Sequence, residues 1–171
     1  ECDVIVATPA ATYIGGEFTY VGPSTGSFTA LDAATGAPAL PCARVNGAVN
    51  ACVSDGAGGW YIGGYFTRVG TAVRNNIAHL LPGGALDPAW NPNADSAVWT
   101  LAVSGTTVYA GGDFTSIGGQ SRNCIAALDA ATGAATAWDP NADSTVWTLA
   151  VNGTTVCVGG SFATIGGQVR N

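Results

Sequence analysis

The chain has 171 residues, of which 47% are hydrophobic and only 9% charged, with 25 glycines and 8 prolines. This apolar share excludes a disordered chain, and the glycine and proline content is typical of folds with many short strands and turns. The net charge is -6 and arginine supplies all five basic side chains, so binding to nucleic acid is not expected. No apolar run approaches the roughly 20 residues of a membrane helix, so no membrane span is expected.

A Gly-Gly pair followed one residue later by Phe occurs four times at a constant interval of 48 residues. An interval of roughly 20–50 residues indicates a repeat architecture in which each unit packs against its neighbours. The whole chain, 1–171, is therefore divided into units at about 1–46, 47–94 and 95–142 and a partial unit, 143–171. The four motifs are Gly15-Gly16-Glu17-Phe18, Gly63-Gly64-Tyr65-Phe66, Gly111-Gly112-Asp113-Phe114 and Gly159-Gly160-Ser161-Phe162.

Each unit begins with a predicted hairpin, which is clearest in the third unit. Residues 98–103 are rich in strand formers, Ser104-Gly105 follows as a turn signal, and residues 106–111 form the return strand. In the fourth unit the turn is Asn152-Gly153, the strongest short hairpin signal. The Gly-Gly pair ends the second strand, where a missing Cβ permits positive φ or a close backbone approach.

Two further strands are predicted in the third unit. Residues 124–129 form the third, which ends at the tight turn Thr132-Gly133, and residues 134–138 form a short fourth. Four short antiparallel strands without helical periodicity predict an all-β fold, a β-propeller of four-stranded blades with about 3.5 blades present. Closed propellers typically have 4–8 blades, so we expect further chain or another subunit to complete the propeller.

Two pairs of tryptophans recur one period apart. Trp90 and Trp138 are predicted to pack between blades, and Trp99 and Trp147 form a second pair. An exposed pair would instead offer a surface on which sugar rings stack.

The repeat resembles known propeller families. A Gly-Gly doublet, a Leu-Asp-x-x-Thr-Gly turn and then a Trp are similar to the kelch pattern. The string Val-Tyr-Ala-Gly-Gly-Asp-Phe-Thr-Ser-Ile-Gly-Gly-Gln-Ser-Arg-Asn, from 108 to 123, most resembles the delta-sixty-type propeller repeats of large secreted bacterial proteins. The resemblance covers essentially the whole chain, most strongly 90–171. It implies a propeller in an extracellular or cell-surface setting and no common activity.

The chain offers few candidates for catalysis. Copper oxidases of the kelch fold use Tyr, His and Cys ligands. The single histidine here, His79, lies in a predicted strand and is expected to have a structural role. No cofactor is therefore expected. Paired carboxylates could support glycoside hydrolysis. Glu17 and Asp113 share one repeat position, but Tyr65 and Ser161 fill it elsewhere. We therefore expect a non-enzymatic protein, with hydrolysis as the alternative.

Three of the five arginines recur at one position, each followed by Asn: Arg74, Arg122 and Arg170. A repeated arginine predicts a repeated structural role, hydrogen bonding to neighbouring loop carbonyls or to an Asp. A ring that binds anions is the alternative.

One segment matches the first half of a calcium loop. Asp139, Asn141 and Asp143 alternate along the chain, so their side-chain oxygens could converge on one cation. The segment lacks the glycine at the sixth place and the distal Glu, and residues 91–95 of the preceding unit carry one carboxylate fewer. Asp-Pro and Asn-Pro are also ordinary turn initiators. Turn chemistry is the preferred interpretation, and no metal is expected.

Five cysteines, without Cys-x-x-Cys or Cys/His spacing, predict disulfides of a secreted protein, with buried free thiols as the alternative. Cys157 replaces the Tyr of the second strand and Cys124 lies in the third strand of the preceding blade, so face-to-face packing could bring them together. We predict Cys124–Cys157 and Cys42–Cys52. Cys2 is then left free or pairs elsewhere, unless it displaces Cys42 as the partner of Cys52.

These features favour a non-enzymatic extracellular propeller that serves as a binding, adhesion or structural module of a secreted or surface protein. A protein or glycan partner is expected at the loop faces. The alternatives are a carbohydrate-active hydrolase that uses paired carboxylates and a subunit of an extracellular filament.

Overall fold

The structure is a computed structural model that describes residues 2–7, 12–16, 26–40 and 42–170. Within these ranges every regular element is a strand, and no helix is long and apolar enough to cross a membrane. The strands are β1 (Cys2–Ala7), β2 (Thr12–Gly16), β3 (Ala30–Leu31), β4 (Pro38–Leu40), β5 (Ala48–Ser54), β6 (Trp60–Tyr65), β7 (Arg68–Val69), β8 (Ala72–Val73), β9 (Ile77–Leu80), β10 (Val98–Ser104), β11 (Thr107–Gly112), β12 (Ser116–Ile117), β13 (Gln120–Ser121), β14 (Ile125–Asp129), β15 (Val146–Asn152), β16 (Thr155–Gly160), β17 (Thr164–Ile165) and β18 (Gln168–Val169).

The second and third units each form a three-stranded antiparallel sheet, in the orders β5-β6-β9 and β10-β11-β14. A two-stranded hairpin follows the second strand in each, β7-β8 or β12-β13. The fourth unit has the equivalent pairs β15-β16 and β17-β18, and the first has β1-β2 and β3-β4. The second, third and fourth units therefore share the order of their first strands and of the hairpin that follows.

The predicted fourth strand, 134–138, is reduced to one isolated bridge between Leu128 and Ala135. The Ala135 N–H donates to the Gly118 carbonyl, and the Thr136 carbonyl is bound by Arg122. The bridge itself is held by the Asp129 N–H on the Ala134 carbonyl and by the Thr136 N–H on the Ala127 carbonyl. Because Arg122 binds the Thr136 carbonyl, the ladder ends there, and the sheets have three strands instead of the predicted four.

The predicted hairpin turns lie one residue later than expected. Ser104 pairs with Thr107, so the loop is Gly105-Thr106, and Gly105 has φ 56°. In the fourth unit Asn152 pairs with Thr155, and Gly153 has φ 58°. A glycine with positive φ at the first loop position matches the type II′ turn that suits the twist of a hairpin.

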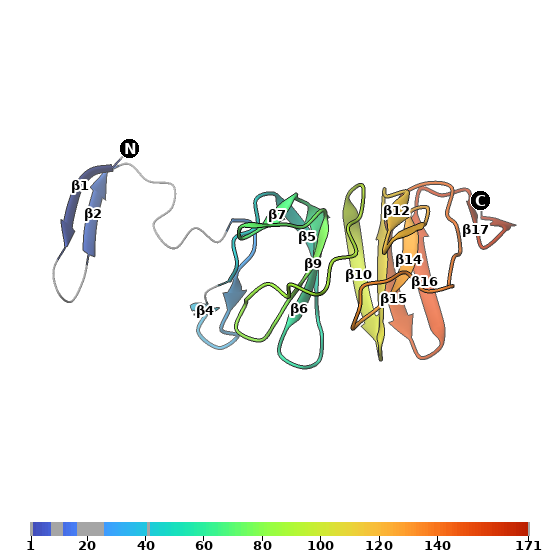
Figure 1. Ribbon diagram of the computed structural model, residues 1–171, viewed down its shortest axis with the longest axis horizontal. Helices are drawn as coiled ribbons and strands as arrows, with labels where there is room; N and C mark the ends of the chain where they lie inside the picture. The colour runs from blue at the N-terminus through green and yellow to red at the C-terminus, as the bar shows by residue number, and fades with distance from the viewer. Residues whose placement is uncertain (1, 8–11, 17–25, 41, 171) are drawn as a thin grey trace.

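The sheets of successive units pack face to face, as Figure 1 shows from β5 through β10 to β15. The described strands form a row in this view, not a closed ring. The Gly-Gly pairs permit the close approach, as predicted from the sequence. A Cβ at Gly63 would lie 2.6 Å from Val98 Cγ1, and one at Gly111 would lie 2.5 Å from Val146 Cγ1.

Trp90 packs between two units, as predicted. Its side chain is fully buried, with its ring 4.9 Å from that of Tyr61, and its Nε1 donates to the Asp129 carbonyl of the next unit over 3.2 Å. Trp138, its repeat equivalent, is half-buried with its ring 5.3 Å from that of Tyr109. The second tryptophan pair also lies across two units.

Candidate binding pocket and polar clusters

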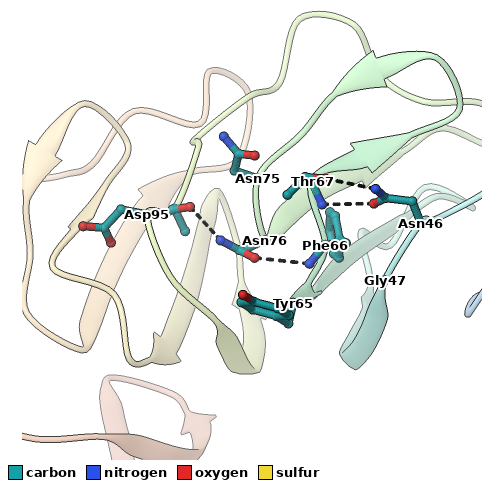
Figure 2. Close-up of a pocket in the computed structure, with 9 residues that line it drawn as sticks. Asn46, Gly47, Tyr65, Phe66, Thr67, Asn75, Asn76 and Asp95 are labelled. Atoms are coloured by element: carbon teal, nitrogen blue, oxygen red, sulfur yellow. Dashed lines mark hydrogen bonds between the residues drawn. The ribbon is translucent and has the colours of Figure 1, made fainter.

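A pocket of about 470 Å³ opens next to the end of β6 and is lined mostly by residues of the second unit (Figure 2). Tyr65 contributes an aromatic ring that is 68% exposed. Amides and one carboxylate form much of the remaining surface. The pocket is lined by Asn46, Gly47, Tyr65, Phe66, Thr67, Asn75, Asn76, Ala94 and Asp95.

Repeated Asn and Asp side chains hold the loops around this pocket. Asn46 Oδ1 accepts hydrogen bonds from the Thr67 and Arg68 N–H groups. Asp95 accepts from the Thr115 and Ser116 N–H groups one unit later. Burial by itself raises the pKa of Asp95, but these bonds and one from the Thr115 hydroxyl outweigh it and hold that pKa below its usual value. The exposed residue Asp95 therefore carries a negative charge at the pocket at neutral pH.

The pocket wall formed by residues 75 and 76 is fixed by internal hydrogen bonds. Asn76 has φ 65°, its Nδ2 donates to the Ala94 carbonyl over 2.9 Å, and its Oδ1 accepts from the Phe66 N–H. Asn75 Nδ2 donates to Asn93 Oδ1 over 2.7 Å. Because these partners lie within the chain, the pocket is formed before any ligand binds.

A bulge explains why the second and third units differ here. The strand register shifts between Val98 and Thr100, which leaves Trp99 outside the ladder, and its Nε1 donates to Asp113 Oδ2 over 2.7 Å. In the second unit the shift lies between Val49 and Ala51 and leaves Asn50 at the equivalent place. Tyr65 stands where the third unit has Asp113, and it is left exposed.

Of the acids of the hydrolase alternative, Asp113 lies within the described residues. Asp113 accepts hydrogen bonds from Trp99 and from the Thr145 hydroxyl, so both of its oxygens have structural partners. Glu17 lies outside the described residues. At the same repeat position Ser161 accepts a hydrogen bond from Trp147 Nε1.

The three calcium candidates have separate partners, which supports the turn interpretation. Asp139 lies 3.6 Å from Arg122 Nη1, and Asn141 Oδ1 accepts from Asn123 Nδ2 over 2.7 Å. Asp143 accepts from two backbone N–H groups, at residues 163 and 164. The described part of the chain holds no group of three or more His, Cys, Asp or Glu side chains that could bind a metal.

Removal of calcium is expected to leave the protein unchanged, because the 139–143 side chains are already engaged by protein donors. The melting temperature should be the same in EDTA and in excess calcium. A large drop in EDTA that calcium restores and magnesium does not would contradict the turn interpretation.

The repeated arginines bind loop carbonyls, as predicted. Arg74 Nη2 donates to the carbonyls of Asp87 and Pro88, and Nη1 donates to the Val73 carbonyl. Arg122 Nη2 donates to the Thr136 carbonyl over 2.7 Å. In the second and third units the arginine thus binds the segment that follows the third strand.

The predicted disulfides are not formed in the structure, where Cys42, Cys52, Cys124 and Cys157 are free thiols. Tyr109, the repeat equivalent of Cys157, pairs with Ala127, and Cys124 lies three residues farther along. Cys124 precedes β14 and has φ 61°, not the extended backbone predicted for it, and Cys157 is exposed on β16.

The second predicted pair also lies in two different environments. Cys52 is exposed on β5, whereas Cys42 is half-buried beside the cluster around Val45. The side chain of Cys2 lies outside the described part.

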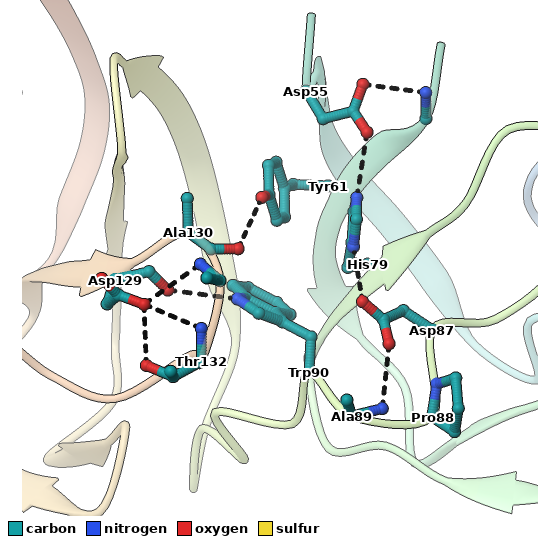
Figure 3. Close-up of polar contacts among 12 residues, drawn as sticks. Asp55, Tyr61, His79, Asp87, Pro88, Ala89, Trp90, Asp129, Ala130 and Thr132 are labelled. Carbon is teal, nitrogen blue, oxygen red and sulfur yellow. Dashed lines mark hydrogen bonds and ion pairs between the residues drawn. The ribbon is translucent and has the colours of Figure 1, made fainter. Parts of the chain in front are cut away.

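The sequence missed a second polar cluster, which surrounds His79 (Figure 3). Nδ1 of the buried imidazole lies 2.9 Å from Asp87 Oδ2, and Nε2 lies 3.2 Å from Asp55 Oδ2. The ring stacks on Tyr61 at 4.4 Å, and the Tyr61 hydroxyl donates to the Ala130 carbonyl of the next unit. This arrangement agrees with the structural role predicted for His79.

Comparison with known proteins supports a propeller-type repeat. A family model described as a beta-propeller domain of unknown function, DUF5122, matches residues 58–89 and 107–131. No curated protein matches the chain. Among solved structures the chain is similar to the computationally designed Ika8 protein, with 15% sequence identity and a TM-score of 0.47. The match covers 96% of this chain and 57% of that structure. The family model and the antiparallel strand pairs together support a β-propeller domain.

Proposed function

We propose that the chain is a non-enzymatic extracellular β-propeller that serves as a binding module of a secreted or surface protein. The resemblance of residues 108–123 to the delta-sixty-type repeats of secreted bacterial proteins supports the extracellular setting. The observation that carries the binding role is the exposed Tyr65 ring beside a pocket whose wall is already fixed.

The chemistry of this pocket favours a neutral glycan. Its volume of about 470 Å³ lies within the range of small-molecule sites. The Tyr65 ring offers an apolar face for a sugar ring, and the polar Asn75 and Asp95 side chains line the pocket beside it. The net charge of -6 and the ionised Asp95 disfavour anionic ligands.

Tyr65→Ala is expected to abolish most glycan binding, because it removes the aromatic face and leaves the hydrogen-bonded wall intact. A screen against neutral oligosaccharides followed by calorimetry with the best ligand measures the effect. Val73→Ala, which removes a side chain that is 55% exposed outside the pocket, is the control and should bind normally. Equal binding by wild type and Tyr65→Ala would contradict the proposed site.

The hydrolase remains the second candidate function, and the same screen tests it. Product formation from any oligosaccharide by the wild type, lost in Asp113→Asn, would replace the binding proposal. Binding without turnover supports the non-enzymatic module.

A further inference from the structure

An Asn-Gly step occurs twice in the chain, at Asn46-Gly47 and at Asn152-Gly153. The side-chain amide of an asparagine can react covalently with the backbone nitrogen of the residue that follows it. Glycine permits this reaction best, because it has no Cβ to shield its nitrogen and its backbone reaches conformations that other residues avoid. The surroundings of the two steps therefore decide which of them reacts in the folded protein.

The Asn46 side chain is held by three hydrogen bonds. Its Oδ1 accepts from the Thr67 N–H over 3.0 Å and from the Arg68 N–H over 2.8 Å. Its Nδ2 donates to Thr67 Oγ1 over 2.9 Å. Gly47 lies against the end of β6, where a Cβ would stand 2.2 Å from the Tyr65 carbonyl oxygen. The amide carbon of Asn46 can therefore approach the Gly47 nitrogen only after these bonds break.

The Asn152-Gly153 step lies at the turn between β15 and β16 and lacks these restraints. Asn152, Gly153 and Thr154 are all exposed. Apart from its chain neighbours, no atom lies within 4 Å of the place where a Cβ on Gly153 would stand. Among the described residues the side chains of β15 and β16 form one hydrogen bond, from Trp147 to Ser161, and none engages Asn152. Both reacting groups of this step are thus accessible.

The third unit shows that this accessibility belongs to the hairpin and not to the place of the fourth unit in the chain. There the turn reads Ser104-Gly105-Thr106, β11 is paired with β14, and β10 contacts the strands β5 and β15 of both neighbouring units. Gly105 and Thr106 are nevertheless exposed. Gly105 has the same open surroundings, with φ 56° against 58° at Gly153. Neighbouring strands therefore do not cover this turn.

We propose that Asn152 is a site of spontaneous deamidation and that Asn46 is protected from it in the folded protein. The Gly153 nitrogen attacks the side-chain carbonyl carbon of Asn152, and the bond from this carbon to the amide nitrogen breaks. The amide nitrogen leaves as ammonia with the proton that Gly153 loses. Water then opens the cyclic imide at either carbonyl, which leaves aspartate or isoaspartate at position 152. The step needs water and no other reactant.

The products change the hairpin in two ways. Each adds one negative charge to a chain whose net charge is already -6. Isoaspartate also adds one methylene to the backbone, which disturbs the pairing of residue 152 with Thr155 and of Val151 with Val156. The chemistry of this product is recognised by enzymes that methylate isoaspartyl carboxylates, and such an enzyme is the class of partner expected here. The proposal is independent of the glycan pocket.

Incubation of the folded protein at mildly alkaline pH, followed by peptide mapping with mass spectrometry, tests the assignment. The segment that contains Asn152 should gain about 1 Da and accept methyl groups from an isoaspartyl methyltransferase. Asn152 should react at least about 10-fold faster than Asn46, since one hydrogen bond that must first break slows a reaction by this order. In guanidinium, where the fold is lost, the two asparagines should react at similar rates.

Two variants of the turn are matched controls. Asn152→Ser introduces the residue that the third unit has at Ser104, so it should keep the hairpin and remove the mass gain. Ser104→Asn should create a second reactive step, because Gly105 has the conformation and the open surroundings of Gly153. Equal rates at Asn46 and Asn152 in the folded protein would overturn the proposal. So would an Asn152 that stays intact in the folded protein after the unfolded chain has reacted.

Discussion

Replacement of Trp90 by alanine is expected to lower the free energy of unfolding by about 3–5 kcal/mol, the usual cost of removing a fully buried large aromatic side chain. Trp90 is 0% exposed, packs against Tyr61 and donates to the Asp129 carbonyl of the next unit. Its loss would open a cavity where two sheets meet and leave one loop carbonyl without its donor. Urea unfolding followed by circular dichroism measures the loss.

Trp138→Ala is the matched control, since Trp138 holds the same repeat position but is only half-buried. It should cost clearly less than Trp90→Ala, because less apolar surface returns to water. Trp90→Phe should fall between them, since it keeps part of the packing and loses the Nε1 hydrogen bond. Equal losses for the two alanine variants would mean that Trp90 does not join the units.

Features that local chemistry determines were predictable from the sequence. The Gly-Gly doublets predicted close approach, and at Gly63 and Gly111 a side chain would collide with the valine of the next sheet. The Leu-Asp-x-x-Thr-Gly turn is built by the Asp129 carboxylate, which accepts from the Thr132 N–H and hydroxyl. Each of these features depends on a few neighbouring residues or recurs along the chain. Each could therefore be predicted from the repeated sequence alone.

Features that depend on competition between distant groups were not predictable. The fourth strand has suitable residues, but its Thr136 carbonyl is bound by Arg122 and does not continue the ladder with β14. The predicted Cys124–Cys157 pair failed for a related reason. Cys124 lies before β14 with φ 61°, and Cys157 is exposed, whereas its repeat equivalent Tyr109 packs on Trp138.

The candidate sites were missed because each occurs in one unit only. From the sequence, Tyr65 was interpreted only as the residue that replaces Glu17 and Asp113 in the second unit. Its exposure follows from Asn50, which lies where the third unit has Trp99. Asn50 and Trp99 are equivalent only because each lies at the bulge of its strand, 49 residues apart. The constant 48-residue spacing of the Gly-Gly pairs does not reveal this. The Asp55–His79–Asp87 cluster likewise has no counterpart at the matching positions of the third unit, so periodicity gave no signal for it.

His79→Ala is expected to cost about 1–3 kcal/mol of stability at neutral pH, the range for leaving buried polar groups without their hydrogen-bond partner. The side chains of His79, Asp55 and Asp87 are only 11%, 10% and 18% exposed, so both carboxylates would remain desolvated without their shared partner. The stacking on Tyr61 would be lost as well. Thermal and urea unfolding at pH 7 measure the change. His79→Gln, which can still donate a hydrogen bond, should recover part of it.

The same cluster should make the protein labile to acid. Burial alone raises the pKa of Asp55 and Asp87, but the hydrogen bonds and charge of His79, together with backbone N–H groups at 57, 59 and 89, outweigh it and hold both pKa values below the usual 3.8.

Because the unfolded chain binds these protons at higher pH than the folded chain, the stabilisation is complete above the usual pKa and is lost as the pH falls through the lowered folded values. Asp87→Asn isolates one share of this effect from that of the other acids. The free energy of unfolding of Asp87→Asn should be lower than that of wild type by the full amount at pH 7. This difference should shrink below about pH 4 and vanish once Asp87 is protonated in the folded wild type. Unfolding free energies of both proteins from pH 7 to pH 2 test this, and a deficit that does not change across the range would show that Asp87 acts by packing and not by its charge.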